Sequence, residues 1–478
     1  MWKQLKSLFG RDQGQIRTRR KKRLIPSSIS EIKHQVREEI RVAGTRIAAD
    51  VLALQSSIRE IRSVANRGGK RLAVLSILPP SESGVARFTL ETFRSAGFAV
   101  DIFSSFDRAS YYLNFESDER LGPISVWHVD ALPVAHRAFH YDAVVVVLAN
   151  STHNLPIAQA MRDVVPALGI PVFVQVHDPR LNNLARRMFG TSFDQACSQY
   201  YPMRESHSDL PCTKMVLGRN PIAGILVHSD AALDIVAKDF GVDAPPIHKL
   251  FHPVFASTVG SVQRGHPLTV GTFGVPGRDK CTIETLEAFR IVRKAEPNAR
   301  LILAGYQADK FASRHASALP DGIEIYSSPS DQKLVELMSQ VDVAVQLRRS
   351  NYGESSGAVP QLLCLNKSVI TSPIGAFKEY GDAVTFVHLP LKPEGIADCI
   401  FRARKISQRQ ASAIARYAEE HTAHAFCERL EKIIWPSEPD SRSASRSKPL
   451  CALSGVDSDV CIKSGLPDES LRRPTINY

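Results

Sequence analysis

Charged side chains follow two short apolar runs in the second half of the sequence. The run Pro267–Phe273 leads into a glycine-bearing loop that ends at Lys280, and the run Val341–Leu347 leads into a polar loop that contains Glu354. Short apolar runs rich in β-branched residues are typical of buried parallel strands. Parallel sheets bind ligands at the carboxyl ends of their strands, where helix N-termini attract phosphate. These loops are therefore suited to a diphosphate, whose charge the cations would offset.

Three apolar runs in the first half also end in polar or glycine-bearing loops. The runs and the residues that follow them are Arg71–Leu78 with Gly84, Asp142–Leu148 with Asn150 and His153, and Ile170–Val176 with His177 and Asp178. Because ligands bind at the carboxyl ends of parallel strands, we expect these residues to face one cleft. A lone histidine is usually a hydrogen-bonded loop residue. Two strand ends with a similar set of polar residues favour contacts with a substrate.

Strand-like and helix-like segments alternate along most of the chain, which predicts the α/β class with parallel, doubly wound sheets. The predicted segments are a basic N-terminal segment (1–25), a long amphipathic helix (26–69), an N-terminal Rossmann-like domain (70–240), a linker (241–266), a C-terminal Rossmann-like domain (267–405), a helix that crosses back to the first domain (406–436) and a disordered tail (437–478). Within them, 190–221 is predicted to be irregular and 408–434 to be one helix.

Composition excludes several classes of protein. The eight cysteines are scattered and form no CxxC pair, so neither a zinc site nor a disulfide framework is predicted, and no other metal motif is credible. Reduced thiols indicate a cytoplasmic protein. No apolar run reaches the roughly 18 residues of a membrane span, and Met1–Gly10 lacks the apolar core of a signal peptide.

The net charge of +11 is concentrated at the two ends of the chain. The segment Met1–Phe9 places Trp2, Leu5 and Leu8 near one helical face, as in a basic helix that lies at the inner face of an anionic membrane. A frayed, solvated terminus is the alternative. Nucleic acid is suggested only by the charge of the termini, so no specific nucleic-acid partner is expected.

Apolar residues recur every 3.6 residues from Ile29 to Ala65, which predicts one long amphipathic helix. Ser28 and Glu31 form a capping box at its start. The helix can pack on the chain's own body or pair with a second copy. Its length exceeds that of one domain, which favours a homodimer formed through residues 28–66.

The stretch from Val341 through GESSGAV resembles the sugar-nucleotide loop of retaining glycosyltransferases of family 4. That family has the GT-B fold, in which two Rossmann-like domains face each other. The segments Asn150–His153 and His177-Asp178 are similar to the family's Gly-Asn-x-x-x-His and His-Asp patterns, and Gly84 matches its N-terminal loop. The resemblance covers about Arg71 to Ile434.

This resemblance implies transfer of a hexose from a nucleotide-diphosphate sugar to a glycan or lipid-linked acceptor with retention of configuration, as in cell-surface polysaccharide synthesis, and without a cofactor. It assigns Lys280 to the diphosphate, Glu354 to the donor sugar, and His153 and Asp178 to the acceptor and the reacting ring. The candidate catalytic residues are Glu354, Lys280 and His153; the donor-binding residues are Gly274, Arg278, Lys280, Arg348, Glu354, Ser355, Ser356, Gly357, Ala358 and Gln361; the acceptor-side residues are Gly84, Asn150, His153, His177 and Asp178. Arg278 and Arg348 are included for their positive charge beside the expected phosphate site, not from the resemblance.

Four positions depart from the family's pattern. Val275 stands where the family has an arginine, for which Arg278 is the candidate substitute. Gln361 stands where the family has a second carboxylate associated with the donor's ribose, Cys281 stands where glycine is usual, and Asn366 opens an altered turn. Asparagine tolerates a left-handed backbone, so the turn can form. A non-catalytic scaffold that kept the fold is therefore the alternative. A nicotinamide-dependent oxidoreductase is disfavoured, because no GxGxxG followed by an acidic residue about 20 positions later is present.

Overall fold

The computed structural model describes most of the chain between residues 50 and 436. The described ranges are 50–62, 69–79, 81, 83–105, 124–202, 209–255 and 267–436. The predicted basic N-terminal segment, most of the predicted long helix and the predicted disordered tail lie outside them. None of the described helices is long and apolar enough to cross a bilayer.

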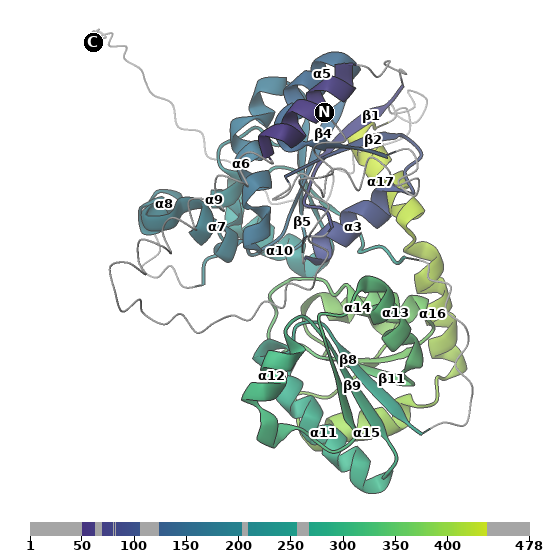
Figure 1. Cartoon of the computed structure of the whole chain (residues 1–478). Helices are drawn as coiled ribbons and strands as arrows, with labels where there is room; N and C mark the ends of the chain where they lie inside the picture. The colour runs from purple at the N-terminus through teal and green to yellow at the C-terminus, as the bar shows by residue number, and fades with distance from the viewer. Residues whose placement is uncertain are drawn as a thin grey trace, which may run out of the picture. The chain divides into compact units, whose positions relative to one another are not determined.

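The first half of the described chain forms a seven-stranded parallel sheet with the strand order β3-β2-β1-β4-β5-β6-β7. Strands β1, β2, β4 and β5 are labelled in Figure 1. Its strands are β1 (Arg71–Leu75), β2 (Ala99–Ser104), β3 (Ile124–His128), β4 (Ala143–Leu148), β5 (Val172–Val176), β6 (Gly224–Val227) and β7 (Ile247–Lys249). The strand order reverses between β1 and β4. The loops that follow these two strands diverge there and open a crevice.

Helices cover this first sheet. They are α3 (Gly84–Phe93), α5 (Leu132–Phe139), α6 (Leu155–Asp163), α7 (Asn182–Phe189), α8 (Phe193–Tyr200), α9 (Thr213–Leu217) and α10 (Asp230–Phe240). Two of them, α8 and α9, lie in the stretch 190–221, which the sequence suggested to be irregular. In α8 the residues Phe193, Ala196 and Cys197 are buried, and this i, i+3, i+4 spacing is that of an amphipathic helix.

A second parallel sheet has the strand order β10-β9-β8-β11-β12-β13. Its strands are β8 (Thr269–Phe273), β9 (Arg300–Gly305), β10 (Ile323–Ser327), β11 (Val343–Gln346), β12 (Ser368–Thr371) and β13 (Thr385–Phe386). This order also reverses, between β8 and β11. The two loops with the predicted donor residues follow these two strands, so both lie at a topological switch point. The predicted pair of Rossmann-like domains is thus confirmed.

Both faces of the second sheet are covered. Its helices are α11 (Thr282–Ala295), α12 (Ala308–Arg314), α13 (Asp331–Gln340), α14 (Ala358–Cys364) and α15 (Pro393–Ala403). Val343 and Val345 belong to one hydrophobic core, with buried side chains of α11 and α15. Ala344, between them, belongs to another core with side chains of α13 and α14. Successive side chains of β11 thus alternate between the two faces of the sheet, as in any strand. Because both faces are buried, the sequence from Val343 to Val345 is apolar without interruption.

The predicted single helix over 408–434 is two helices, α16 (Gln408–Glu420) and α17 (Ala423–Ile434). The Thr422 hydroxyl accepts the N–H of Ala425 at 3.1 Å and so caps the second helix. Buried side chains of α16 join a core of the second domain, whereas those of α17 join the core of the first, and α17 lies beside α3 (Figure 1). The chain therefore returns to the first domain.

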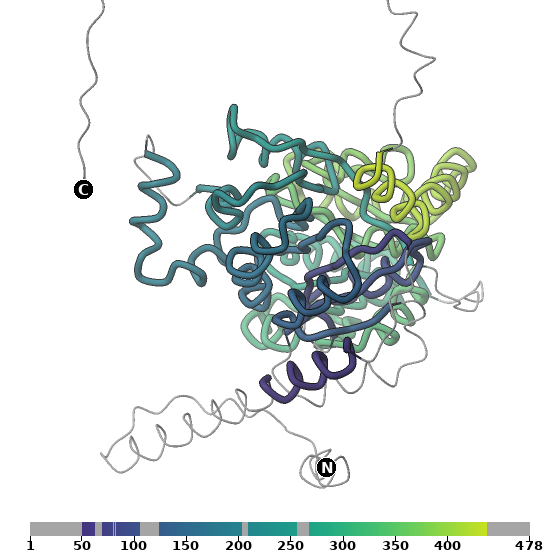
Figure 2. Tube along the Cα trace, turned by 90° about the horizontal axis from the view of Figure 1, so that it is seen from above, coloured from purple at the N-terminus to yellow at the C-terminus, as the bar shows by residue number. Residues whose placement is uncertain are grey.

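Two further segments belong to the first domain. Strand β7 lies within the predicted linker and pairs with β6, while 256–266 lies outside the described residues. Helical residues 50–62 pack on the domain through buried Ala53 and Ile61, and Figure 2 shows them in dark purple. The described part of the long helix thus packs on its own chain; a homodimer remains a prediction.

Candidate active site

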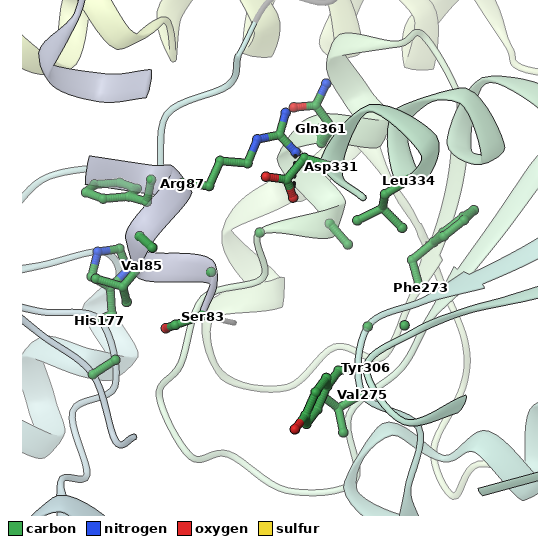
Figure 3. A pocket seen from close by; sticks show the side chains of 18 of the residues that line it. Ser83, Val85, Arg87, His177, Phe273, Val275, Tyr306, Asp331, Leu334 and Gln361 are labelled. Carbon is green, nitrogen blue, oxygen red and sulfur yellow. Dashed lines mark ion pairs between the residues drawn. The ribbon is translucent and has the colours of Figure 1, made fainter. Parts of the chain in front are cut away.

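A cavity of about 670 Å³ is lined by loops that follow strands of both sheets (Figure 3). Nine of the predicted site residues line it: Gly84, Asn150, His177, Asp178, Gly274, Ser355, Gly357, Ala358 and Gln361. In Figure 3, His177 and side chains of α3 face the cavity opposite Phe273, Val275 and Tyr306. The structure therefore brings predicted donor-side and acceptor-side residues to one cavity.

Glu354 lies between two cations. Its Oε1 atom is 3.1 Å from Nε of Arg348 and 4.0 Å from Nζ of Lys280. The Arg348 side chain is only 6% exposed, stands 4.8 Å from the Phe377 ring centroid, and donates a second hydrogen bond to the Leu347 carbonyl. Burial, followed by the charge of Arg348, lowers the pKa of Lys280 to about 8. One carboxylate between two cations leaves this cluster (Arg348, Lys280, Glu354) with a net positive charge suited to an anionic ligand.

Asp178 approaches the same cluster from the first domain. Its Oδ2 accepts the backbone N–H of Asn150 at 2.6 Å. Burial raises the pKa of Asp178 to about 6; that hydrogen bond opposes the shift and the negative charge of Glu354 adds to it. The side chain of Asn150 bonds to the start of α7, donating to Asn182 and accepting the N–H of Asn183. The loops after β4 and β5 are thus fixed together.

Six predicted residues are not among those that line this cavity. Lys280, Arg348 and Glu354 form the charged cluster described above, and three others are placed differently. His153 lies exposed on a 3₁₀ turn and is not among the residues that line the cavity. Arg278 is exposed, and its carbonyl accepts a hydrogen bond from Nε of Arg349. Ser356 is buried, and its hydroxyl accepts the N–H of Val359 at the start of α14. The structure does not bring His153 to the other candidate residues.

The structure shows the surroundings of Cys281, Asn366 and Gln361, three of the residues that depart from the family's pattern. Cys281, buried in place of the usual glycine, has a left-handed φ of 51° directly before α11, and Asn366 has a φ of 54°, as its sequence suggested. The amide Nε2 of Gln361 donates to the carbonyl of Phe255 at 3.2 Å. An ionised carboxylate has no N–H to donate, so the amide makes a bond between the domains that a glutamate could not.

No protein-family model and no curated protein matches the sequence. Solved structures do resemble it. HepE of Anabaena, in complex with UDP and glucose, superposes with a TM-score of 0.54 at 13% identity, over 76% of this chain and 99% of that one. A glycosyltransferase of Rickettsia africae gives 0.53 at 12% identity, over 77% and 100% of the chains. The N-terminal domain of Candida albicans trehalose-6-phosphate phosphatase gives 0.51 at 13% identity, over 77% and 97%. The chain has the GT-B fold.

Two buried histidines that were not among the predicted site residues lie next to His177; His252 lines the same cavity, and His228 packs between the two. His228 follows β6 and His252 follows β7, and together with His177 they form what we call the histidine cluster. Ring centroids of His177 and His228 are 4.5 Å apart, those of His228 and His252 are 5.2 Å apart, and the Phe88 ring contacts all three edge-on. A histidine at the end of three neighbouring strands was a usable sequence signal.

Hydrogen bonds fix the tautomers within this cluster. Nδ1 of His228 is 3.1 Å from the Leu250 carbonyl, which only accepts, so Nδ1 carries the proton. Nε2 of His228 then accepts from Gln175 and from Nδ1 of His177, each at 3.2 Å. Burial lowers the pKa of all three rings, to about 3 for His228 and about 4 for His252. The cluster is therefore neutral at pH 7.

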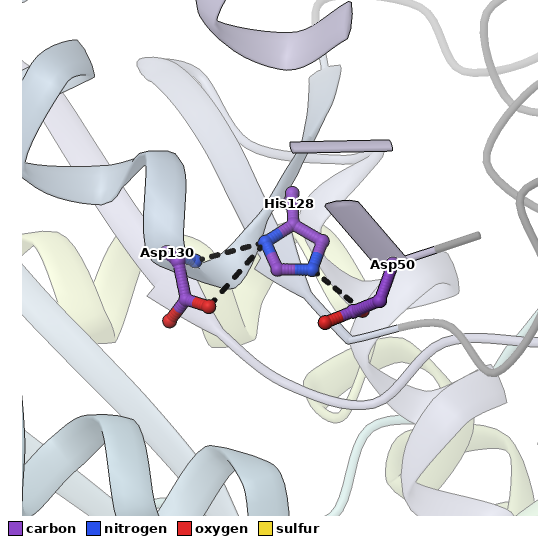
Figure 4. Close-up of side chains that lie close together, drawn as sticks. All are labelled: Asp50, His128 and Asp130. Carbon is purple, nitrogen blue, oxygen red and sulfur yellow. Dashed lines mark hydrogen bonds and ion pairs between the residues drawn. The ribbon is translucent and has the colours of Figure 1, made fainter. Parts of the chain in front are cut away.

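Among the described residues, one group of three side chains of the types that can ligate a metal comes together, outside the cavity: Asp50, His128 and Asp130 (Figure 4). Nδ1 of His128 accepts the backbone N–H of Asp130 at 3.2 Å, so Nε2 carries the proton and donates to Asp50 at 2.7 Å. Both ring nitrogens are thus used. The group ties helical residues 50–62 to the end of β3.

Gly305 permits the close approach of two loops at the cavity wall. A Cβ at this position would lie 1.9 Å from the backbone oxygen of Gly274. We expect Gly305→Ala to lower the free energy of unfolding by about 1–3 kcal/mol, as overpacking does, in urea titrations. Gly395→Ala in α15 is the matched control, because a Cβ there meets nothing within 4 Å. Equal stability of the two variants would contradict the prediction.

Proposed function

We propose that this protein is a retaining glycosyltransferase that moves a sugar from a nucleotide-diphosphate sugar to a glycan or lipid-linked acceptor. The observation that carries the proposal is the cluster of Arg348, Lys280 and Glu354 beside a cavity that Asp178 reaches from the other domain. HepE, which shares the fold, was solved with UDP and glucose, a nucleotide and a sugar of the proposed kinds. A cytoplasmic site of action at the inner face of a membrane completes the proposal.

Each residue has a role that its chemistry permits. Lys280 and Arg348 neutralise the departing diphosphate, and Glu354 accepts hydrogen bonds from donor-sugar hydroxyls. Backbone N–H groups from Ser355 to Ala358 meet phosphate oxygens at the start of α14. Asp178, mostly ionised at pH 7 with a pKa of about 6, supports positive charge that develops on the sugar ring. His153 has no part in this scheme, because its side chain is exposed and no hydrogen bond or ion pair of the described residues joins it to the cluster or to Asp178.

A thermal-shift screen with nucleoside diphosphates and nucleotide sugars tests the proposal. A ligand at 100 times its dissociation constant adds roughly 2.7 kcal/mol of stability. We expect one nucleotide to shift the melting curve of the wild type and of Lys294→Ala, an exposed lysine of α11, but not of Lys280→Ala. No shift with any nucleotide would overturn the proposal.

Nucleotide binding should weaken as the pH rises through about 8. Lys280 has a pKa of about 8, so it is protonated below that pH and loses its charge above it. Calorimetric titration should show the dissociation constant of the nucleoside diphosphate rising by up to about tenfold per pH unit above pH 8. In Lys280→Arg the charge persists, so the rise should disappear; a rise of equal size in both proteins would assign it to another group.

A non-catalytic binding protein is the second candidate, because Gln361 uses its amide within the protein where the family has a carboxylate. It predicts the same thermal shifts without turnover. Release of the nucleoside diphosphate from a bound nucleotide sugar, with or without an acceptor, separates the two functions.

A further inference from the structure

A second cavity, of about 390 Å³, adjoins the first. Its walls come from the end of β7, the 3₁₀ segment η9 (Gly375–Ala383) and the helices α16 and α17. His252 and Ser355 line both cavities, so the two are separated by little more than these side chains. The volume falls within the range of roughly 300–1,000 Å³ that is typical of small-molecule sites.

Aromatic rings form one wall of this second cavity. Tyr417 and His421 stack with ring centroids 3.9 Å apart and planes 13° apart, and Phe251 meets His421 edge-on at 4.6 Å. Nδ1 of His421 is 2.9 Å from the Tyr417 carbonyl and therefore carries the proton, which leaves Nε2 as an acceptor. Burial lowers the pKa of His421, so the ring is neutral at pH 7.

Two cations line the second cavity, and they differ in whether an acidic side chain of the protein already pairs with them. Lys249 pairs with Asp230 at 2.8 Å and with Glu379 at 3.4 Å. Arg429, in contrast, is exposed and stacks over the Phe251 ring at 4.6 Å. Within the part of the chain that the structure describes, its guanidinium has no ion pair or hydrogen bond. Such a guanidinium is a ready partner for phosphate or carboxylate.

We propose that the second cavity binds a monosaccharide that carries one anionic group, a phosphate or a carboxylate. Arg429 binds the anion, Nε2 of His421 and the carboxylate of Glu379 accept hydrogen bonds from hydroxyls, and the aromatic wall covers the apolar face of the ring. The proposal does not rest on the sugar-transfer reaction, since none of Lys280, Glu354 and Asp178 lines this cavity.

Calorimetric titration of the full chain tests the site with four probes: glucose 6-phosphate, glucuronate, neutral glucose and inorganic phosphate. We expect at least one of the two anionic sugars to bind with a dissociation constant below about 1 mM, and at least tenfold more tightly than glucose or inorganic phosphate. The difference between phosphate and carboxylate sugars identifies the anion. Failure of both anionic sugars, or equal binding of inorganic phosphate, would overturn the proposal.

Variants then locate the binding. Arg429→Gln should weaken binding at least tenfold, and Arg416→Gln, an exposed arginine on α16, should leave it within twofold. His421→Gln supplies a second variant that keeps the ring face of Tyr417. Lys280→Ala should retain binding of the anionic sugar while losing that of nucleotides. Loss of sugar binding in Lys280→Ala with retention in Arg429→Gln would place the sugar in the first cavity and refute the second site.

Discussion

Glu354→Gln is expected to lower sugar transfer by about 10–100-fold, the loss that accompanies removal of a charged hydrogen-bond acceptor worth roughly 1.5–3 kcal/mol. Binding of the nucleoside diphosphate should remain or become tighter. The reason is that Glu354 lies between Arg348 and Lys280, so loss of its charge leaves both cations free to meet the diphosphate. Turnover with the nucleotide sugar and calorimetry with the diphosphate measure the two effects separately.

Glu287→Gln is the matched control for this experiment, because Glu287 is exposed on α11 and does not line the cavity. Transfer by Glu287→Gln should equal that of the wild type. Unchanged transfer in Glu354→Gln would remove Glu354 from the donor site. Parallel losses of transfer and of diphosphate binding would mean instead that the carboxylate holds the loop in place rather than the sugar.

The sequence was sufficient to predict features that depend on short stretches of chain. Apolar β-branched runs marked the strands, and the loops that follow β8 and β11 marked Lys280 and Glu354, which the structure brings together. The cap at Thr422 was also readable, since a threonine before a new apolar period is a helix start.

Other features depend on distances that one sequence does not contain. His153 and Asp178 looked equivalent as polar residues after strands, yet only Asp178 reaches the cavity, because the turn Thr152–Asn154 places His153 outside. The bond from Gln361 to Phe255 joins residues 106 positions apart. The histidine cluster draws its rings from the ends of three strands, and its importance follows from burial around Phe88, which spacing alone does not reveal.

That burial predicts acid lability of the folded protein. His228 and His252 have pKa values of about 3 and about 4, and that of His177 is also well below its usual value. Below pH 6.5 the unfolded chain binds protons at these positions while the folded chain does not, so stability falls as the pH falls. The rings of His228 and His252 should each lower the free energy of unfolding by about 2 kcal/mol between pH 7 and pH 5, and His177 acts in the same direction. Asp178 contributes to the pH dependence of stability with the opposite sign, because its pKa is raised to about 6. It takes up a proton in the folded chain as the pH falls and so offsets part of the loss of stability caused by one histidine ring.

Urea titrations at pH 7 and pH 5 measure this loss. His228→Asn keeps an N–H that can reach the Leu250 carbonyl but removes a titrating group. We expect this variant to be less stable than the wild type at pH 7. Because one titrating group is gone, its free energy of unfolding should fall by about 2 kcal/mol less than that of the wild type between pH 7 and pH 5. His388→Asn, at an exposed histidine, should follow the wild-type pH dependence. Replacing a group that titrates only in the unfolded chain must reduce the change of the free energy of unfolding with pH. If His228→Asn nevertheless follows the wild-type pH dependence, the neutral histidine cluster is not the source of the acid lability.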